Sequence, residues 1–234
     1  HRLIRRQRQM CIRDRIHAGP EIGVASTKAF LGQMLVLYLF SLKIGEVRGD
    51  LDNKKYKKLI SNLRNLPQLI KETLKEEQKI QLIAKDIYNS KGSMFLGRGS
   101  SYPIAMEGAL KLKELSYLHA EGYPAGEMKH GPLALIEDGL PVVVIAPKDK
   151  YFEKTLSNMQ EVIARGGKVL LLTNSDGKVI SENIRFQIDL PSSDLSLTPF
   201  IFTIPLQLLS YHVALFKKCD IDKPRNLAKS VTVE

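Results

Sequence analysis

Cysteine and long apolar runs are both scarce in this sequence of 234 residues. The two cysteines, Cys11 and Cys219, allow at most one disulfide and have no metal-ligand spacing, which is typical of a protein of the reducing cytoplasm. The longest apolar run, residues 34–40, is far shorter than the roughly 18 residues that a membrane span needs. We therefore expect a cytoplasmic protein that has no metal site and no contact with a membrane.

Positive charge is abundant, with a net +10, but it is unevenly distributed. Residues 1–15 contain six arginines and a single acid, Asp14, and so hold +5 of the total. The other 219 residues share the remaining +5, which is a mildly basic surface suited to small anionic ligands. This distribution is poor evidence for nucleic-acid binding, and we expect no nucleic-acid partner.

The arginine-rich segment 1–15 has no helical or strand period and no turn chemistry. One interpretation is a basic arm for nucleic acid. Another is a targeting peptide, although the apolar core and cleavage pattern of a signal peptide are missing. Residues 8–15 also resemble translated sequencing-adaptor sequence. We expect the segment to be non-native or disordered, and resequencing the locus would decide between these interpretations.

Hydrophobic periodicity predicts helices first and then an alternating α/β pattern. A helix should begin at Ser26, whose hydroxyl suits an N-cap, and end near Gly45. Residues 52–88 are helical and highly charged, with a break or kink at Pro67. Apolar strands are expected at residues 93–96, 141–146, 168–173 and 184–189, and helices at about 103–118, 153–165 and 199–217. This alternation predicts a doubly wound parallel sheet, with ligands bound beyond the carboxyl ends of its strands.

The glycine-rich stretch GRGSS at residues 97–101 lies between an expected strand and an expected helix. Free N–H groups at such a turn can bind phosphate, but glycines there are also ordinary turn chemistry. The stretch matches neither the dinucleotide fingerprint nor the Walker pattern, and no cofactor is expected.

Glu107, Lys111 and Glu114 are spaced so that they share one face of the following helix. They could form an exposed ladder of salt bridges. Alternatively, they place a carboxylate beside an ammonium for proton transfer. Spacing alone does not choose between the two.

Residues 121–132 form the stretch with the most unusual composition, with three glycines and two prolines around Glu127, Lys129 and His130. A loop held in a special conformation with titratable residues is a functional candidate. Histidine is the only residue type in this stretch whose intrinsic pKa is near neutrality, so His130 has either a chemical or a structural role. Lys229, five residues from the last residue, would normally be solvated.

Four blocks, in order along the chain, resemble one family. They are residues 18–30, 106–114, 126–135 and 224–234, and the likeness covers nearly all of 17–234. The sequence resembles the isomerase half of the glutamine–fructose-6-phosphate aminotransferases, which contains two flavodoxin-like sugar-isomerase (SIS) domains. The resemblance implies a helical remnant of a first SIS domain at 16–45, a connector at 46–89, a second SIS domain at 90–217 and a catalytic tail at 218–234.

The resemblance also implies roles for particular residues. Lys229 matches the lysine that forms a Schiff base with open-chain fructose 6-phosphate. Glu114 matches the carboxylate that moves a proton between C1 and C2, and Lys111 matches a lysine that assists at the sugar hydroxyls. His130 matches the histidine that opens the sugar ring, which in the family comes from the partner subunit of a homodimer.

Val24 and Ser26 match residues that contact the sugar at the end of the first SIS domain. The main sugar-phosphate loops of that domain, and the glutaminase that supplies ammonia from glutamine, have no match here. Cys11 is not in the context of the glutaminase cysteine. We therefore expect a fragment that is inactive alone.

Two rival functions remain open. Another SIS enzyme, a sugar-phosphate isomerase or deaminase, would not be expected to share the tail at residues 224–234. A non-catalytic sugar-phosphate-sensing module would need neither His130 nor Lys229, and would usually lie beside a DNA-binding helix-turn-helix, for which the sequence has no candidate.

Overall fold

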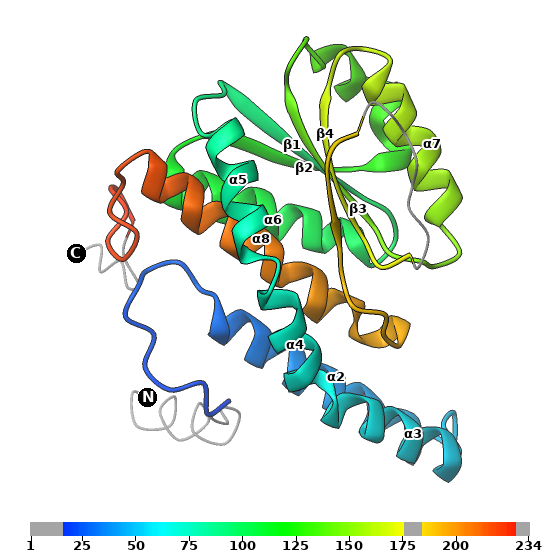
Figure 1. Ribbon diagram of the computed structural model, residues 1–234. Coiled ribbons are helices and arrows are strands. Elements are labelled where there is room, and N and C mark those ends of the chain that lie inside the picture. The colour runs from blue at the N-terminus through cyan, green and yellow to red at the C-terminus, as the bar shows by residue number, and fades with distance from the viewer. Residues whose placement is uncertain (1–15, 176–183, 228–234) are drawn as a thin grey trace, which may run out of the picture.

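Among the described residues, four helices precede the sheet along the chain (Figure 1). The computed structural model describes residues 16–175 and 184–227. The segment 1–15 and the predicted catalytic Lys229 lie outside these ranges. The four helices are α2 (Lys28–Val47), α3 (Asn53–Arg64), α4 (Leu66–Leu74) and α5 (Glu77–Ile87).

The start of α2 differs from the sequence prediction. The helix begins at Lys28 and its N-cap, Thr27, makes no side-chain capping bond. Glu21 replaces the expected hydroxyl, because its Oε1 accepts the N–H of Thr27 at 2.7 Å and that of Ala29 at 3.4 Å. A carboxylate at a helix N-terminus also complements the helix dipole.

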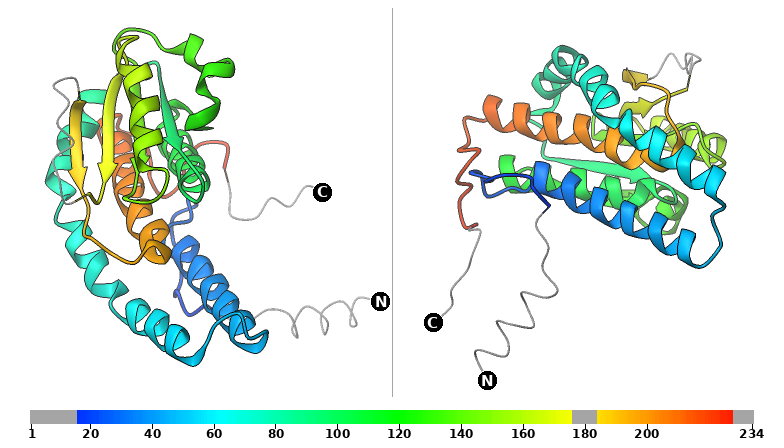
Figure 2. Two further views of the ribbon diagram at one scale, coloured as in Figure 1. Left: turned by 90° about the vertical axis from the view of Figure 1, so that its right-hand side faces the viewer. Right: turned by 90° about the horizontal axis from the view of Figure 1, so that it is seen from below.

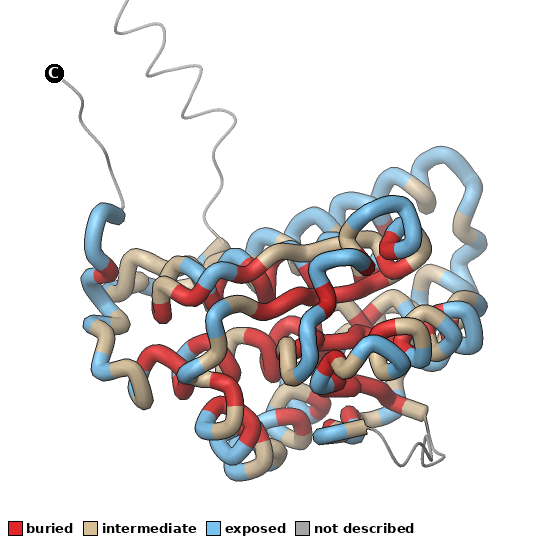
Figure 3. Tube along the Cα trace, turned by 90° about the horizontal axis from the view of Figure 1, so that it is seen from above, coloured by how far each residue is buried: buried red, intermediate tan, exposed pale blue. Residues whose placement is uncertain are grey.

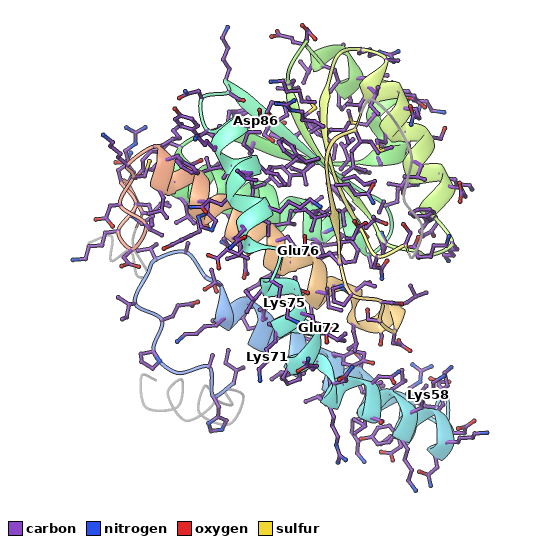
Figure 4. The ribbon with its side chains drawn as sticks, in the orientation of Figure 1. Lys58, Lys71, Glu72, Lys75, Glu76 and Asp86 are labelled. Carbon is purple, nitrogen blue, oxygen red and sulfur yellow. The ribbon has the colours of Figure 1, made fainter. Side chains whose placement is uncertain are left out.

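The charged connector follows the prediction more closely. Asp52 caps α3 by accepting the N–H of Lys55 at 2.7 Å, and Pro67 lies in the first turn of α4, so the helix breaks where proline was expected to break it. Figure 4 labels six charged side chains along this part of the chain, namely Lys58, Lys71, Glu72, Lys75, Glu76 and Asp86. Yet α5 also buries Ile80, Ile83 and Ile87, so the end of the connector belongs to the hydrophobic core.

The sheet has five parallel strands in the order β2-β1-β3-β4-β5, which confirms the predicted doubly wound α/β class. The strands are β1 (Gly92–Gly97), β2 (His119–Pro124), β3 (Pro141–Ala146), β4 (Lys168–Thr173) and β5 (Ile184–Asp189). The helices that join or follow them are α6 (Ser101–Ser116), α7 (Phe152–Ile163) and α8 (Thr198–Phe216), with short 3-10 turns η1 (Ala125–His130), η2 (Pro132–Leu135) and η3 (Leu195–Leu197).

Strand β2 was not predicted, since most of its residues fall within the loop expected at 121–132. Glu121, Gly122 and Pro124 are poor strand formers, and an edge position tolerates them because only one side of the strand must be paired. Gly122 is required by packing: a Cβ there would lie 2.8 Å from the backbone of Met106 in α6.

Each face of the sheet has its own core. Val143 and Ile145 of β3 point toward α5, α6 and α8, while Val142 and Val144 point toward α7. Figure 3 shows buried positions concentrated on the strands and the helices beside them, and Figure 2 shows the layers from two further sides. Alternation within one strand therefore fills both cores.

Two described segments are long and apolar enough to cross a membrane by length and composition alone. This differs from the expectation based on uninterrupted apolar runs, because a few polar residues interrupt segments that are apolar on average. Residues 195–216, which include α8, are 67% buried in the core, whereas α2 is only 6% buried. One side of α2 packs against the core through Leu31 and Leu35, and its other side exposes apolar residues such as Phe40 (61%).

Candidate active site

Three charged side chains form a buried cluster on α6. The ammonium of Lys111 lies 2.6 Å from Glu114 Oε2 and 3.6 Å from Glu107 Oε1. The side chain of Lys111 is 4% exposed, that of Glu107 9% and that of Glu114 24%. The structure thus rejects the exposed ladder, because these groups have lost most of their water.

The cluster contains one cation and two carboxylates. Burial raises the pKa of Glu107 to about 6; the Lys111 ammonium opposes this rise and the Glu114 charge adds to it. Glu107 Oε1 is buried without a hydrogen-bond partner. A desolvated carboxyl group that titrates near neutrality beside an ammonium is suited to proton transfer. Sequence spacing placed Glu107 on this face, but only burial distinguishes it as a functional candidate.

The loop that contains Val24 and Ser26 lies beside the end of α6. A cavity of about 330 Å³ separates them, and its lining residues are Pro20, Glu21, Ile22, Gly23, Ala25, Thr27, Lys28, Leu115, Gln207, Tyr211, Ile221 and Asp222. Leu115 directly follows Glu114. Val24 and Ser26 do not line the cavity, although their neighbours Gly23, Ala25 and Thr27 do. Loop, helix end and tail therefore meet at this cavity.

His130 lies away from the α6 cluster. Glu114 is in the last turn of α6, which leads to the start of β2, and His130 is in η1, after the end of β2. A six-residue strand is about 20 Å long, so the two residues lie at opposite ends of this unit. The His130 side chain is 64% exposed, and its Nε2 is 4.0 Å from Glu127 Oε2. Within one chain, the structure does not bring His130 to the α6 cluster.

The 97–101 turn is explained by packing. A Cβ on Gly97 would lie 2.3 Å from the carbonyl oxygen of Ser101, and one on Gly99, at φ 54°, would meet the ring of Tyr151 at 2.8 Å. Arg98 donates a hydrogen bond to Asn158 Oδ1 at 3.0 Å and lies against Gly126, so it ties the turn to α7 and η1.

A second cavity, of about 400 Å³, lies where the fold rule places ligands, at the carboxyl ends of β1 and β3. Its lining is Gly99, Ser100, Asp149, Lys150, Tyr151, Leu195 and Thr198. None of the predicted catalytic residues is among them. The buried ionisable groups described above lie instead at the α6 cluster. Within the described ranges, no group of three His, Cys, Asp or Glu side chains is arranged to hold a metal ion.

A parallel sheet in this strand order, with helices on both faces and a buried ionisable cluster on its first crossover helix, defines a flavodoxin-like α/β protein. The chain belongs to the SIS-domain family, whose family model matches residues 86–217, more than half of its length.

Individual relatives are more specific than the family model. The glutamine–fructose-6-phosphate aminotransferases [isomerizing] of Bradyrhizobium diazoefficiens and Bacteroides thetaiotaomicron are each 52% identical over 219 residues. The matched part is 93% and 94% of this chain, respectively, but the chain spans only 36% of the length of these relatives.

Solved structures include an enzyme of the same kind as these relatives. The C-terminal domain of glucosamine-fructose-6-phosphate aminotransferase from Francisella tularensis matches with a TM-score of 0.85 at 46% identity, covering 88% of this chain and 58% of that one. A glucosamine-6-phosphate deaminase from Thermotoga maritima matches with a TM-score of 0.66 at 24% identity, covering 92% and 59%; this likeness shows the fold alone.

Proposed function

We propose that this chain is part of an enzyme that converts fructose 6-phosphate and glutamine to glucosamine 6-phosphate and glutamate. The observation that carries the proposal is the buried Glu107–Lys111–Glu114 cluster, which lies in a block matching the aminotransferases. In this proposal the chain supplies the Schiff-base and isomerising groups. The ammonia source and the main phosphate-binding loops belong to the remainder of a longer protein.

The proposed chemistry begins at the C2 ketone of the open-chain sugar. The neutral amine of Lys229 attacks C2 and water leaves, which forms an imine. Glutamine-derived ammonia then displaces the lysine and leaves a C2 ketimine. Glu114 removes a proton from C1 and delivers a proton to C2, while the C1 hydroxyl proton passes to the imine nitrogen, so that the C1 alcohol becomes an aldehyde and C2 carries the amine.

Lys111 is suited to assist because it is held between two carboxylates. Its hydrogen bond to Glu114 orients that carboxylate, and its charge stabilises negative charge that develops at the sugar hydroxyls. Glu107 Oε1 lies 3.6 Å from the Lys111 ammonium on its other side and, when ionised, balances part of that positive charge.

The exposure of His130 supports a homodimer in which each subunit donates this histidine to its partner's site for ring opening. The exposed apolar side of α2 supports a chain that normally packs against a preceding sugar-binding domain. We accordingly propose that residues 16–45 end that domain, that the enzyme is cytoplasmic and that the present chain alone is inactive.

The test uses the complete protein, with fructose 6-phosphate, glutamine and borohydride. Reduction of the imine should leave a sugar covalently attached to Lys229, and Lys229→Ala should abolish both this product and glucosamine 6-phosphate formation. Lys223→Ala, a substitution at an exposed lysine of the same tail, is the control. Unimpaired synthesis by Lys229→Ala would refute the Schiff-base role. Turnover without glutamine would favour an isomerase or deaminase instead.

A further inference from the structure

Tyr117, the residue that follows α6, has an unusual backbone conformation. Its φ of 59° and ψ of 15° are left-handed, a region in which helices normally place glycine. A tyrosine there strains the backbone, so its side chain should have a use that glycine cannot supply.

Both parts of the Tyr117 side chain hold the C-terminal segment. The hydroxyl oxygen accepts the backbone N–H of Arg225 at 2.8 Å. The Arg225 guanidinium lies over the tyrosine ring, 4.2 Å from its centroid, which is cation–π geometry. The neighbouring Pro224 is buried, although the residues on either side of it are exposed.

The same segment is attached at a second point. The Asp222 carbonyl accepts the N–H of Val24 at 2.9 Å, which ties the tail to the loop before α2. Asp220 Oδ1 accepts the N–H groups of Asp222 and Lys223 at 3.0 and 2.9 Å, and so folds the segment into a turn. Figures 1 and 2 show the red tail beside the blue loop. Residues 220–227 are thus held between α6 and the candidate sugar-contacting loop.

We propose that Tyr117 is a positioning residue that anchors this tail segment. It follows Glu114 by three residues, and Arg225 precedes Lys229 by four. The anchor therefore connects the helix of the proton-transfer groups with the segment leading to the Schiff-base lysine. This inference rests on the proposed function for its catalytic consequence, but the anchor itself is a contact that can be tested separately.

The first measurement is hydrogen–deuterium exchange on this chain, followed in peptides spanning residues 217–227. Tyr117→Gly relaxes the backbone but removes both contacts, and it should speed exchange of the Arg225 amide about tenfold. Tyr117→Phe keeps the ring and should give a smaller rise. Lys218→Gly is the matched control, because Lys218 is exposed and also left-handed, with φ 55°, at the end of α8. Unchanged exchange in Tyr117→Gly, or an equal rise in Lys218→Gly, would overturn the anchor.

The second measurement is imine trapping and steady-state kinetics on the complete protein. Tyr117→Gly should lower kcat and the trapped sugar–lysine yield about 10- to 100-fold, with KM for fructose 6-phosphate little changed, and Tyr117→Phe should restore part of the loss. Normal kcat with accelerated exchange would overturn the positioning role. If the wild-type protein forms no imine, the proposed function and the positioning role fail together, and the exchange data still decide the anchor.

Discussion

Replacing Glu107 with glutamine measures the balance of forces in the α6 cluster. Loss of water raises the pKa of Glu107 from 4.5 to about 6, and the attraction of Lys111 cancels only part of that rise. Since one pKa unit corresponds to about 1.4 kcal/mol, ionised Glu107 costs the folded state roughly 2 kcal/mol relative to the unfolded chain.

This penalty depends on pH in a defined direction. The folded protein binds the Glu107 proton more tightly than the unfolded chain does, so the free energy of unfolding falls as pH rises from 4.5 to about 6. Glutamine keeps the shape without the charge. E107Q should therefore match the wild type near pH 4 and be more stable by up to ~2 kcal/mol near pH 8, or about 4–8 °C in melting temperature.

Urea unfolding, followed by circular dichroism across this pH range, measures the effect. E127Q is the control, because the Glu127 side chain is 66% exposed and should leave the pH dependence unchanged. An E107Q protein less stable than wild type near pH 8 would refute the reasoning, since it would mean that pairing with Lys111 outweighs desolvation.

Three further substitutions and one control test the charge balance of the α6 cluster and the packing of the fold. K111M leaves two carboxylates together without their cation, and should destabilise by about 3–5 kcal/mol at neutral pH and less at pH 5, by urea unfolding at both. G122A should cost about 1–3 kcal/mol and speed amide exchange in α6, since the new methyl meets the Met106 backbone at 2.8 Å. L171A, at a fully buried site, should cost about 2–5 kcal/mol, whereas L82A, at a site 63% exposed, should stay within about 0.5 kcal/mol in the same assay.

The sequence was most informative where one structural period dominates. The apolar runs at 141–146 and 168–173 became β3 and β4 because strands buried on both faces need continuous apolar residues. The helical pattern breaks next to Pro67, because proline has no backbone N–H to donate within a continuous helix. Strand β2 was not predicted because its own composition does not favour a strand. It forms through its pairing with β1.

The candidate site was likewise predictable from the sequence only in part. Spacing alone put Glu107, Lys111 and Glu114 on one helical face, and the four resembling blocks indicated the chemistry. Only the tertiary structure decided that this face is buried, which turns an ordinary ion-pair ladder into a desolvated cluster with a raised pKa. It also separated His130 from that cluster and brought Tyr117 to Arg225, 108 positions apart. Periodicity is a local property that a sequence displays directly, whereas desolvation and contacts between distant residues arise only when the layers pack together.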